Sequence, residues 1–234
     1  MSKQSKKPIL VEKKYLIPFI AITSMFFLWG VANDVTNPMV SAFKKVMPEL
    51  SNFQAALVQL AFYGGYGTMA IPAALFIRKY NFKSGILIGL SLYAIGAILF
   101  WPAAVYEEFI FFLMSLYILT FGLAFLETTA NPFILSLGDS RTATQRLNLS
   151  QAFNPIGSLI GMAIAQFFII ENLRSDDLST DAYNLLSPDQ IAFIRQEDLN
   201  IISEVYVGLG IVIFAVIFLI FLIKIPGKNE KSKL

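Results

Sequence analysis

The sequence contains no cysteine and no histidine among its 234 residues. Without cysteine, the chain cannot form a disulfide, use a thiolate nucleophile or ligate an iron–sulfur cluster. Without histidine, it lacks the commonest metal ligand and the commonest side chain that exchanges a proton near neutral pH. It also has no HExxH motif, no Ser–His pair and no phosphate-binding glycine loop. We therefore expect no enzyme, no metal site and no cofactor, and any proton chemistry must use carboxylates.

Charge is scarce as well. Asp, Glu, Lys and Arg make up 15% of the residues and 56% are hydrophobic, whereas a soluble domain carries about 25% charged residues. The formal net charge of +2 gives no reason to expect a nucleic-acid partner. This composition predicts a membrane protein whose solvent is the lipid bilayer.

Six segments are long and apolar enough to cross a membrane, which takes about 20 mainly apolar residues. Shorter buried core helices do not account for them, most plainly for the last segment, VYVGLGIVIFAVIFLIFLI. We predict an all-α membrane protein, a six-transmembrane-helix bundle over residues 15–225. The predicted spans are 15–40, 52–77, 84–104, 109–137, 147–170 and 205–223.

Basic residues between the spans predict the orientation, because cytoplasmic loops carry an excess of Lys and Arg. Fourteen of the 18 basic residues fall on one side, and Lys44, Lys45, Arg174 and Arg195 fall on the other. We expect the side with fourteen to be cytoplasmic, with both termini inside the cell. The prediction thus gives a basic cytoplasmic tail (1–14), an extracytoplasmic loop (171–204) with a short surface helix around 187–200, and the start of a central cytoplasmic loop (226–234).

Polar residues and helix breakers are concentrated in the first, second, fourth and fifth spans. The third and sixth spans are nearly featureless, and the third carries glycines that permit close helix contact. Polar side chains within a span should face a cavity or another helix rather than lipid. We therefore predict that four spans surround a wet cavity and that two brace them.

The first span contains VANDVTNPMV. Asp34 and Asn37 are three residues apart, so they share a helix face. Pro38 has no N–H and disrupts the backbone hydrogen bond to the carbonyl of Asp34. Such a break is tolerated in a membrane where the freed groups meet protein or water. The alternative is a kinked helix end at the outer surface, where Asp34 meets bulk water.

The second span contains LVQLAFYGGYG. Gln59, Tyr63 and Tyr66 follow spacings of four and three residues, which place them on one face of a helix. A tyrosine ring offers an apolar surface with a hydroxyl tip, which suits stacking on a sugar. Aromatic packing between helices explains each tyrosine alone at least as well.

The fourth span contains FLETTANPF, with Glu127 in an otherwise uncharged stretch. Asn131 lies one turn later on the same face, just before Pro132. Glutamate is too short to reach either membrane surface from this depth, and no basic residue shares its depth in any span. Exclusion from water favours the protonated form of a carboxyl group. We therefore favour a proton-binding role for Glu127; the alternative is a buried structural pair with a hydroxyl or amide.

The fifth span, RLNLSQAFNPIGSLIG, places Asn148, Gln151, Asn154 and Ser158 on one stripe. Amides offer donors and acceptors together, as a polyhydroxylated ligand requires. They also join helices by mutual hydrogen bonds, which is the alternative for any one of them. With a buried carboxylate nearby, the stripe favours a polar ligand path, as in a secondary transporter with its site near the midplane.

Several of these motifs resemble the fucose:proton symporter family of the major facilitator superfamily. In that family, a membrane glutamate at the place of Glu127 is implicated in proton coupling and sugar handling, and polar residues of the fifth helix correspond to Gln151 and Asn154. The family pattern has Asp at the place of Asn37 and Asn at the place of Asp34, so the two residue types are exchanged here. The motifs that carry the resemblance are FFLWGVAND, NFQAALVQLAFYGGY, LYAIGAILFWPAA, LETTANPF and RLNLSQAFN.

The resemblance implies twelve spans in two six-helix halves, and this sequence matches the amino-terminal half. It implies proton-coupled transport of fucose or a related hexose across the plasma (inner) membrane, with the proton as coupling ion. The expected partner is a second six-helix half, either a separate chain or a second copy of this one. A non-transporting six-helix module that acts as an assembly partner is the alternative. The expected proton-coupling residues are Glu127 and Asp34, and the expected substrate-binding residues are Asn37, Gln59, Tyr63, Asn131, Gln151 and Asn154.

Overall fold

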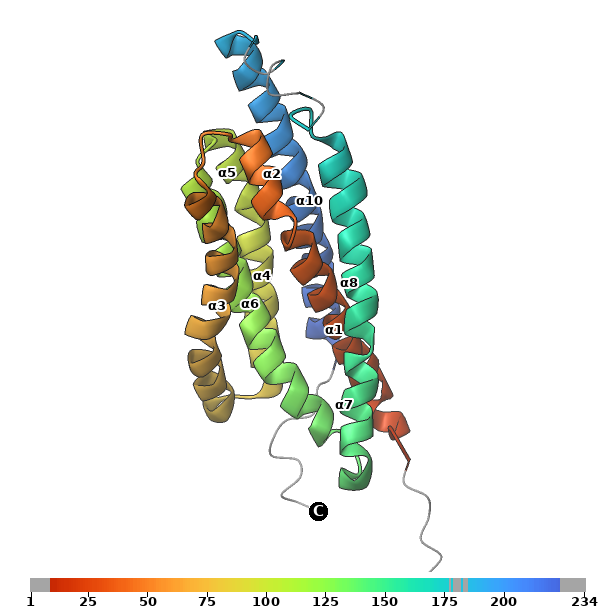
Figure 1. Cartoon of the computed structure of the whole chain (residues 1–234). Coiled ribbons are helices and arrows are strands. Elements are labelled where there is room, and N and C mark those ends of the chain that lie inside the picture. Colours follow the sequence, from red (N-terminus) through yellow and green to blue (C-terminus); the bar gives the residue numbers. More distant parts are fainter. Residues whose placement is uncertain (1–8, 177, 179–181, 183–184, 224–234) are drawn as a thin grey trace, which may run out of the picture.

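The computed structural model describes residues 9–176, 178, 182 and 185–223 (Figure 1). Within these residues, all regular secondary structure is helical, and six helical stretches are long and apolar enough to cross a membrane. The predicted six-span all-α bundle is thereby confirmed. The predicted basic tail (1–14) is described only from Ile9, and the predicted central loop (226–234) lies outside the described residues.

Three of the six spans are divided into shorter helices. The first span starts with a 3₁₀ turn, η1 (Lys13–Tyr15), and continues as α1 (Leu16–Thr36) and α2 (Met39–Val46); the second is α3 (Asn52–Lys79); the third is α4 (Phe82–Ile98) and α5 (Phe100–Tyr106); and the fourth is α6 (Phe109–Ser136). The fifth span consists of η2 (Ser140–Thr142), α7 (Ala143–Gln151), α8 (Phe153–Ile164), the π-helical η3 (Ala165–Ile169) and η4 (Ile170–Asn172). The sixth span is α10 (Pro188–Leu222).

A proline accounts for a division in each of these three spans; in the third, Pro102 cannot donate to the carbonyl of Ile98, at which α4 ends. The break predicted at Pro38 is present, since α1 ends at Thr36 and α2 starts at Met39. In the fifth span, Pro155 cannot donate to the carbonyl of Gln151, four residues earlier, and α7 ends at that residue. Pro72 and Pro132 are instead accommodated inside α3 and α6.

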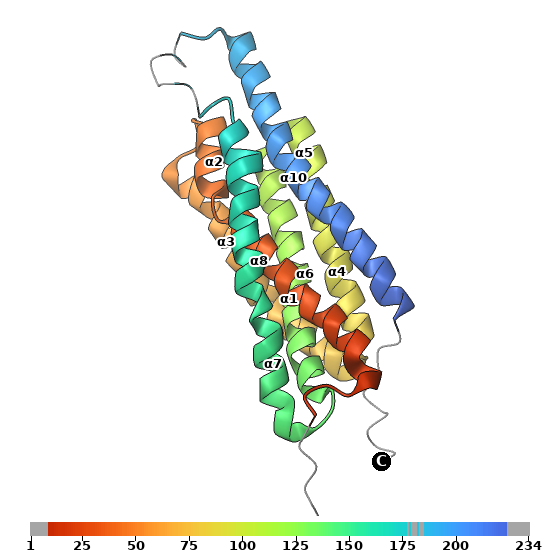
Figure 2. The ribbon, with the colours of Figure 1, turned by 90° about the vertical axis from the view of Figure 1, so that its right-hand side faces the viewer.

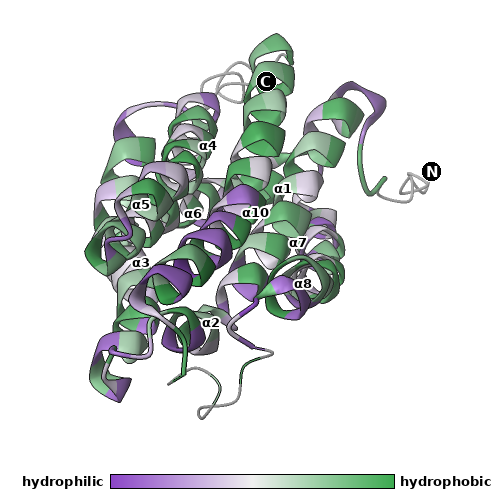
Figure 3. Cartoon of the chain, turned by 90° about the horizontal axis from the view of Figure 1, so that it is seen from above, coloured by the Kyte–Doolittle hydropathy of each residue, from purple (hydrophilic) through white to green (hydrophobic). Residues whose placement is uncertain are grey.

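The short surface helix predicted around 187–200 and the predicted sixth span, 205–223, form one continuous helix. Helix α10 begins at Pro188 and continues without a break to Leu222, so no loop separates the two. Ser187 and Gln190 form a reciprocal capping box around a proline in the first turn, which is a strong helix start. This charged part of α10 extends beyond the bundle in Figure 1, and its hydrophilic residues are prominent in the view from above (Figure 3).

Helix α6 occupies the centre of the bundle. It packs against α4 on one side and α3 on the other, while α1 packs along α8, and α10 lies against α4 and α5 (Figure 2). The most apolar part of α6 is also more buried than that of any other described span. The third span therefore packs on α6, and the sixth span packs on the outer side of the third. That four spans surround a wet cavity stays a prediction.

Glycines allow the closest helix contacts. A Cβ added at Gly157 of α8 would collide with the backbone carbonyl of Phe27 in α1, and one at Gly30 of α1 would collide with the carbonyl of Asn154. A similar contact joins α4 and α6, where Gly122 meets the backbone of Gly89. In lipid, helices associate through such close packing because the acyl chains are as apolar as the side chains.

The buried side chain of Arg146 ties together the end of the bundle at which α6 stops and α7 starts. Arg146 is 0% exposed. Its guanidinium donates to the carbonyls of Ile134 (3.3 Å), Leu135 (3.1 Å), Asp139 (3.0 Å) and Leu10 (3.2 Å), and to the Thr142 hydroxyl (2.7 Å). The sequence identifies Arg146 only as a marker of orientation, whereas the structure shows that it also satisfies the last carbonyls of α6.

In the turn between these helices, Arg141 pairs with Asp139 (2.7 Å) and lowers the pKa of that carboxyl group to about 2. At the same end of the bundle, Lys83 donates to the carbonyls of Phe221 (2.8 Å) and Ile223 (2.9 Å). The start of the third span therefore lies beside the end of the sixth. Lys83, Arg141 and Arg146, which the sequence assigns to one side, therefore lie at one end of the described bundle.

The α1–α8 contact gives a first prediction. Gly157→Ala should lower the free energy of unfolding by about 1–3 kcal/mol, the usual cost of overpacking. Gly208→Ala is the matched control, because a Cβ there meets no atom within 4 Å; it should change stability by less than about 0.5 kcal/mol. Thermal unfolding of both variants in one detergent measures the difference, and equal midpoints would contradict the predicted contact.

The hydrogen bonds of Arg146 give a second prediction. Arg146→Lys keeps the charge but offers three donors in place of five, so it cannot satisfy all the acceptors. We expect a loss of about 2 kcal/mol in unfolding free energy, as for hydrogen bonds to a charged group. Arg141→Lys, at an exposed ion pair, should cost less than about 1 kcal/mol. Denaturation monitored by circular dichroism compares the two, and an equal loss in both would count against the role assigned to Arg146.

Candidate functional site

A cavity of about 350 Å³ lies between α3 and α6. Glu127 and Asn131 line it from one face of α6, as their spacing predicts. Glu127 stands nine residues before the end of α6, about 13 Å along the helix axis at 1.5 Å per residue. The cavity is lined by Tyr66, Ala70, Ala124, Glu127, Thr128 and Asn131.

Glu127 is half-buried and has no cationic neighbour. None of the ion pairs in the part of the chain that the structure describes involves this carboxylate. The adjacent hydroxyl of Thr128 donates to the carbonyl of Ala124 in its own helix (2.7 Å) and is thereby engaged elsewhere. The carboxyl group thus faces a small cavity with no fixed charge to oppose it.

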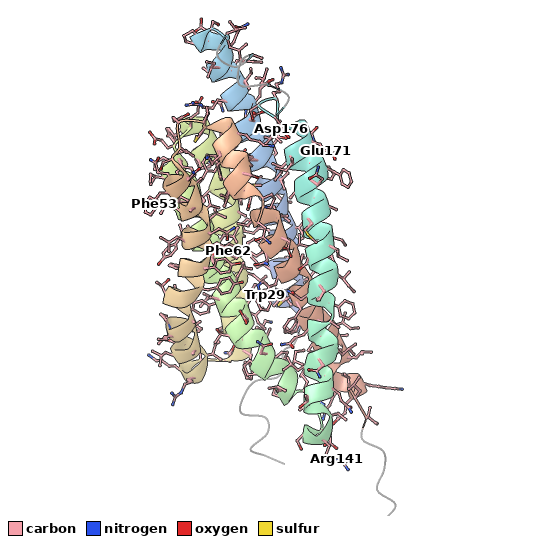
Figure 4. All side chains as sticks on the ribbon, viewed as in Figure 1. Trp29, Phe53, Phe62, Arg141, Glu171 and Asp176 are labelled. Carbon is pink, nitrogen blue, oxygen red and sulfur yellow. The ribbon has the colours of Figure 1, made fainter. Side chains whose placement is uncertain are left out.

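Tyr66 lines the cavity, although it is not among the site residues predicted from the sequence. Its hydroxyl oxygen is buried, approaches Trp29 of α1 and lies near Glu127, yet it forms no hydrogen bond of good geometry within the described residues. Its ring packs edge-on against Phe62 at 5.7 Å between centroids. The labelled Phe62 and Trp29 lie near mid-height of the bundle in Figure 4. The spacing of Gln59, Tyr63 and Tyr66 places all three on one face of the helix, but it does not indicate which of them reaches the cavity.

Gln151 joins the fifth span to this site. Its side-chain amide nitrogen donates to the Oδ1 atom of Asn131 at 3.3 Å, across the gap between α7 and α6. Three of the predicted residues, Glu127, Asn131 and Gln151, are therefore adjacent.

Asn154 has a structural contact. Its Nδ2 atom donates to the backbone carbonyl of Phe26 at 3.1 Å, where α8 crosses α1. This is the helix-joining role that an amide can play in place of ligand binding. Substrate binding by Asn154 stays a prediction.

Asp34 and Asn37 lie together at the end of α1, away from the α3–α6 cavity. Asn37 donates to the Oδ1 atom of Asp34 at 2.6 Å, and its own side chain is exposed. The neighbouring Thr36 is anchored by a 3.0 Å hydrogen bond to the hydroxyl of Tyr206 in α10. The structure confirms the kinked helix end, and neither residue is among those that line the cavity. A coupling role for Asp34 and a substrate-binding role for Asn37 stay predictions.

Gln59 and Tyr63 precede Tyr66 on α3 by two turns and one turn. Neither lines the cavity. Tyr63 is 57% exposed and packs its ring against Phe62 at 5.5 Å, so aromatic packing explains part of its contacts. Its role in substrate binding, like that of Gln59, is untested by this arrangement.

No protein-family model matches the chain. It is 59% identical over 221 residues to the L-fucose-proton symporter of Haemophilus influenzae, covering 93% of this chain and 51% of that protein. It is 39% identical over 221 residues to the L-fucose-proton symporter of Escherichia coli, covering 94% and 50%. A glucose/galactose transporter of Brucella abortus is 32% identical over 171 residues, covering 73% and 41%.

Among solved structures, the chain matches FucP, a major facilitator superfamily transporter captured in the outward conformation. The TM-score is 0.79 at 39% sequence identity, covering 92% of this chain and 51% of that one. The chain therefore spans about half the length of the relatives that it matches.

The contacts of the two amides in the fifth span give a third prediction. Asn154→Ala should cost about 1 kcal/mol of unfolding free energy, because it removes a partly buried bond between α8 and α1. Gln151→Ala should cost less than about 0.5 kcal/mol, since that side chain is exposed. Chemical denaturation of both variants in one detergent provides the measurement, and the opposite ranking would mean that the Phe26 contact is not structural.

Proposed function

Since the chain belongs to the fucose:proton symporter family of the major facilitator superfamily and corresponds to its amino-terminal half, we propose that it supplies the proton-binding half of a sugar–proton symporter. The observation that carries this proposal is the position of Glu127 in a cavity with no cationic partner. A carboxyl group in such a place can change between its charged and neutral forms as its surroundings become wet or dry. An ionisable residue inside a membrane span is by default a candidate functional residue.

The surroundings of Glu127 suit a sugar. Asn131 and Gln151 offer amide donors and acceptors, and the Tyr66 hydroxyl is without a partner in the described structure. Tyr66 and Trp29 add aromatic surface beside these polar groups, a combination that binds the polar edge and apolar face of a monosaccharide. The relatives carry the names of fucose and glucose/galactose transporters, which supports a hexose as the substrate class.

The mechanism follows from the charge of Glu127. A proton from the outside neutralises the carboxylate, and the neutral site then accepts the sugar through the neighbouring amides and aromatic rings. The loaded site turns toward the cytoplasm, where the proton and the sugar leave. The site turns between the two sides of the membrane in two states: with neither proton nor sugar bound, or with both bound. Sugar uptake is therefore tied to proton entry.

Turning the site requires a second six-helix half, which moves against this one. The relatives are about twice as long as the chain, and this supports such a partner, either in a longer polypeptide or in a separate chain. The cluster of basic residues at one end of the bundle supports the proposed orientation, with that end in the cytoplasm. The names of the relatives do not favour the alternative of a non-transporting assembly module.

The proposal gives a fourth prediction. In a protein that joins this chain to its second half, Glu127→Gln should abolish sugar accumulation above equilibrium, because the amide cannot release a proton. One-to-one coupling to a gradient of one pH unit sustains about tenfold accumulation, and the variant should reach a ratio of about one. Proteoliposomes with an imposed pH gradient and radiolabelled hexose provide the measurement.

Glu204→Gln is the matched control for this experiment, because Glu204 lies on α10 and is not among the residues that line the cavity. That variant should retain uphill uptake. Unchanged, pH-driven accumulation in Glu127→Gln would remove the proposal. Sugar exchange between equal concentrations, which needs no net proton movement, shows whether the variant remains folded and able to bind.

A further inference from the structure

An apolar groove on the lipid-facing side of the bundle is separate from the Glu127 cavity. It has a volume of about 320 Å³ and lies between the first turns of α1 and the last turns of α10. Ile17, Ile20 and Ala21 line one wall, and Leu219, Ile220 and Ile223 line the other. The hydroxyl of Ser24, also at the groove, donates to the carbonyl of Ala21 in its own helix (2.8 Å). The groove is thus apolar along its length.

The two walls are joined toward the far end of α1, where Thr36 and Tyr206 share a hydrogen bond of 3.0 Å. Toward the basic end, large aliphatic side chains remain exposed on both helices: Ile17 is 65% exposed and Leu219 is 57% exposed. In a bilayer, acyl chains are the apolar groups that can cover these side chains. The groove occupies the leaflet next to the basic end, because Ile17 and Ala21 belong to the first turns of α1.

Positive charge is placed at the mouth of this groove. Lys83 donates to the carbonyl of Ile223, which itself lines the groove, and to that of Phe221. An ammonium group has three donors, so one N–H remains after these two bonds, and the ammonium also lies 5.6 Å from the centroid of the Phe221 ring. Lys14 precedes Ile17 by three residues and is exposed, although it also pairs with Glu12 at 3.1 Å. The groove therefore ends at a cation that is fixed to the protein backbone.

We infer that this groove binds one acyl chain of an anionic phospholipid whose phosphate contacts Lys83. The apolar walls accept the chain, and the remaining donor of Lys83 meets a headgroup of opposite charge. Such a lipid fills the space that α1 and α10 leave open and links the first and last spans of the bundle. The inference is independent of sugar transport, since none of its residues lines the Glu127 cavity.

A second apolar groove provides an internal comparison. It has a volume of about 250 Å³, lies between α3 and α6, and includes Ala61 and Leu113 among its lining residues. No lysine or arginine lines it, and Glu107 and Glu108 immediately precede α6. Lipid that enters this second groove should show no preference for a negative headgroup.

Native mass spectrometry of the purified 234-residue chain tests the inference. The probe is an equimolar mixture of phosphatidylglycerol and phosphatidylethanolamine with identical acyl chains. We expect phosphatidylglycerol to be retained about fivefold over phosphatidylethanolamine, the ratio expected for one lysine near an anionic lipid. Lys83→Gln should reduce that ratio to about one, and Lys83→Arg should preserve it.

Two groove-filling variants complete the design. Ala21→Phe should reduce the retention of phosphatidylglycerol because the added ring occupies the groove, whereas Ala61→Phe, in the second groove, should leave it unchanged. Circular dichroism and a single oligomeric peak confirm that each variant is folded. Equal retention of the two lipids by the unmodified chain would overturn the inference. So would a preference that survives both Lys83→Gln and Ala21→Phe, or one that Ala61→Phe abolishes.

Discussion

A carboxylate deep within a membrane helix cannot face acyl chains without a large cost in free energy, and the position of Glu127 therefore constrains the packing of α6. One face of α6 turns Glu127 and Asn131 toward α3 and a polar cavity. Another face carries Gly122, which meets the backbone of Gly89 in α4 at a distance that only small residues allow, and Leu126, whose side chain packs on Gly89. Because both faces of α6 need partners, the helix lies at the centre of the bundle, and α10 lies outside α4 where little polarity is required.

Features that depend on local chemistry could be predicted from the sequence. Length and hydropathy locate the six spans, and the missing N–H of Pro38 predicts the end of α1. The continuity of α10 was not predicted because a hydropathy criterion stops at charged residues, whereas a helix stops only where its backbone loses hydrogen bonds. The capping box of Ser187 and Gln190 starts the helix in water, and nothing between Pro188 and the apolar part interrupts it.

In the candidate site, the sequence predicts which residues of one helix lie on the same face, but not which residues of other helices they meet. Glu127 and Asn131 share a face of α6 and do line one cavity. Tyr66 was not distinguished from Tyr63, because the two tyrosines share one face of α3 and both rings pack on Phe62. Only the packing of α3 against α6, a contact between different spans, shows that Tyr66 lines the cavity. Asn154 shows the same limit: its spacing suits a ligand stripe, but the carbonyl of Phe26 lies within reach of its amide.

The contacts of α1 tie the helices of the bundle into one unit. Toward Thr36, α1 is fixed by the hydroxyl of Tyr206, whose ring also stacks on Phe100 of the third span at 3.7 Å. Along its length, α1 is held to α8 by glycine contacts that leave no room for sliding. At the basic end, Arg146 binds the last carbonyls of α6 and the carbonyl of Leu10 together. A displacement of α1 must therefore carry α6 and α8 with it, and the residues around Glu127 keep their arrangement when the bundle moves.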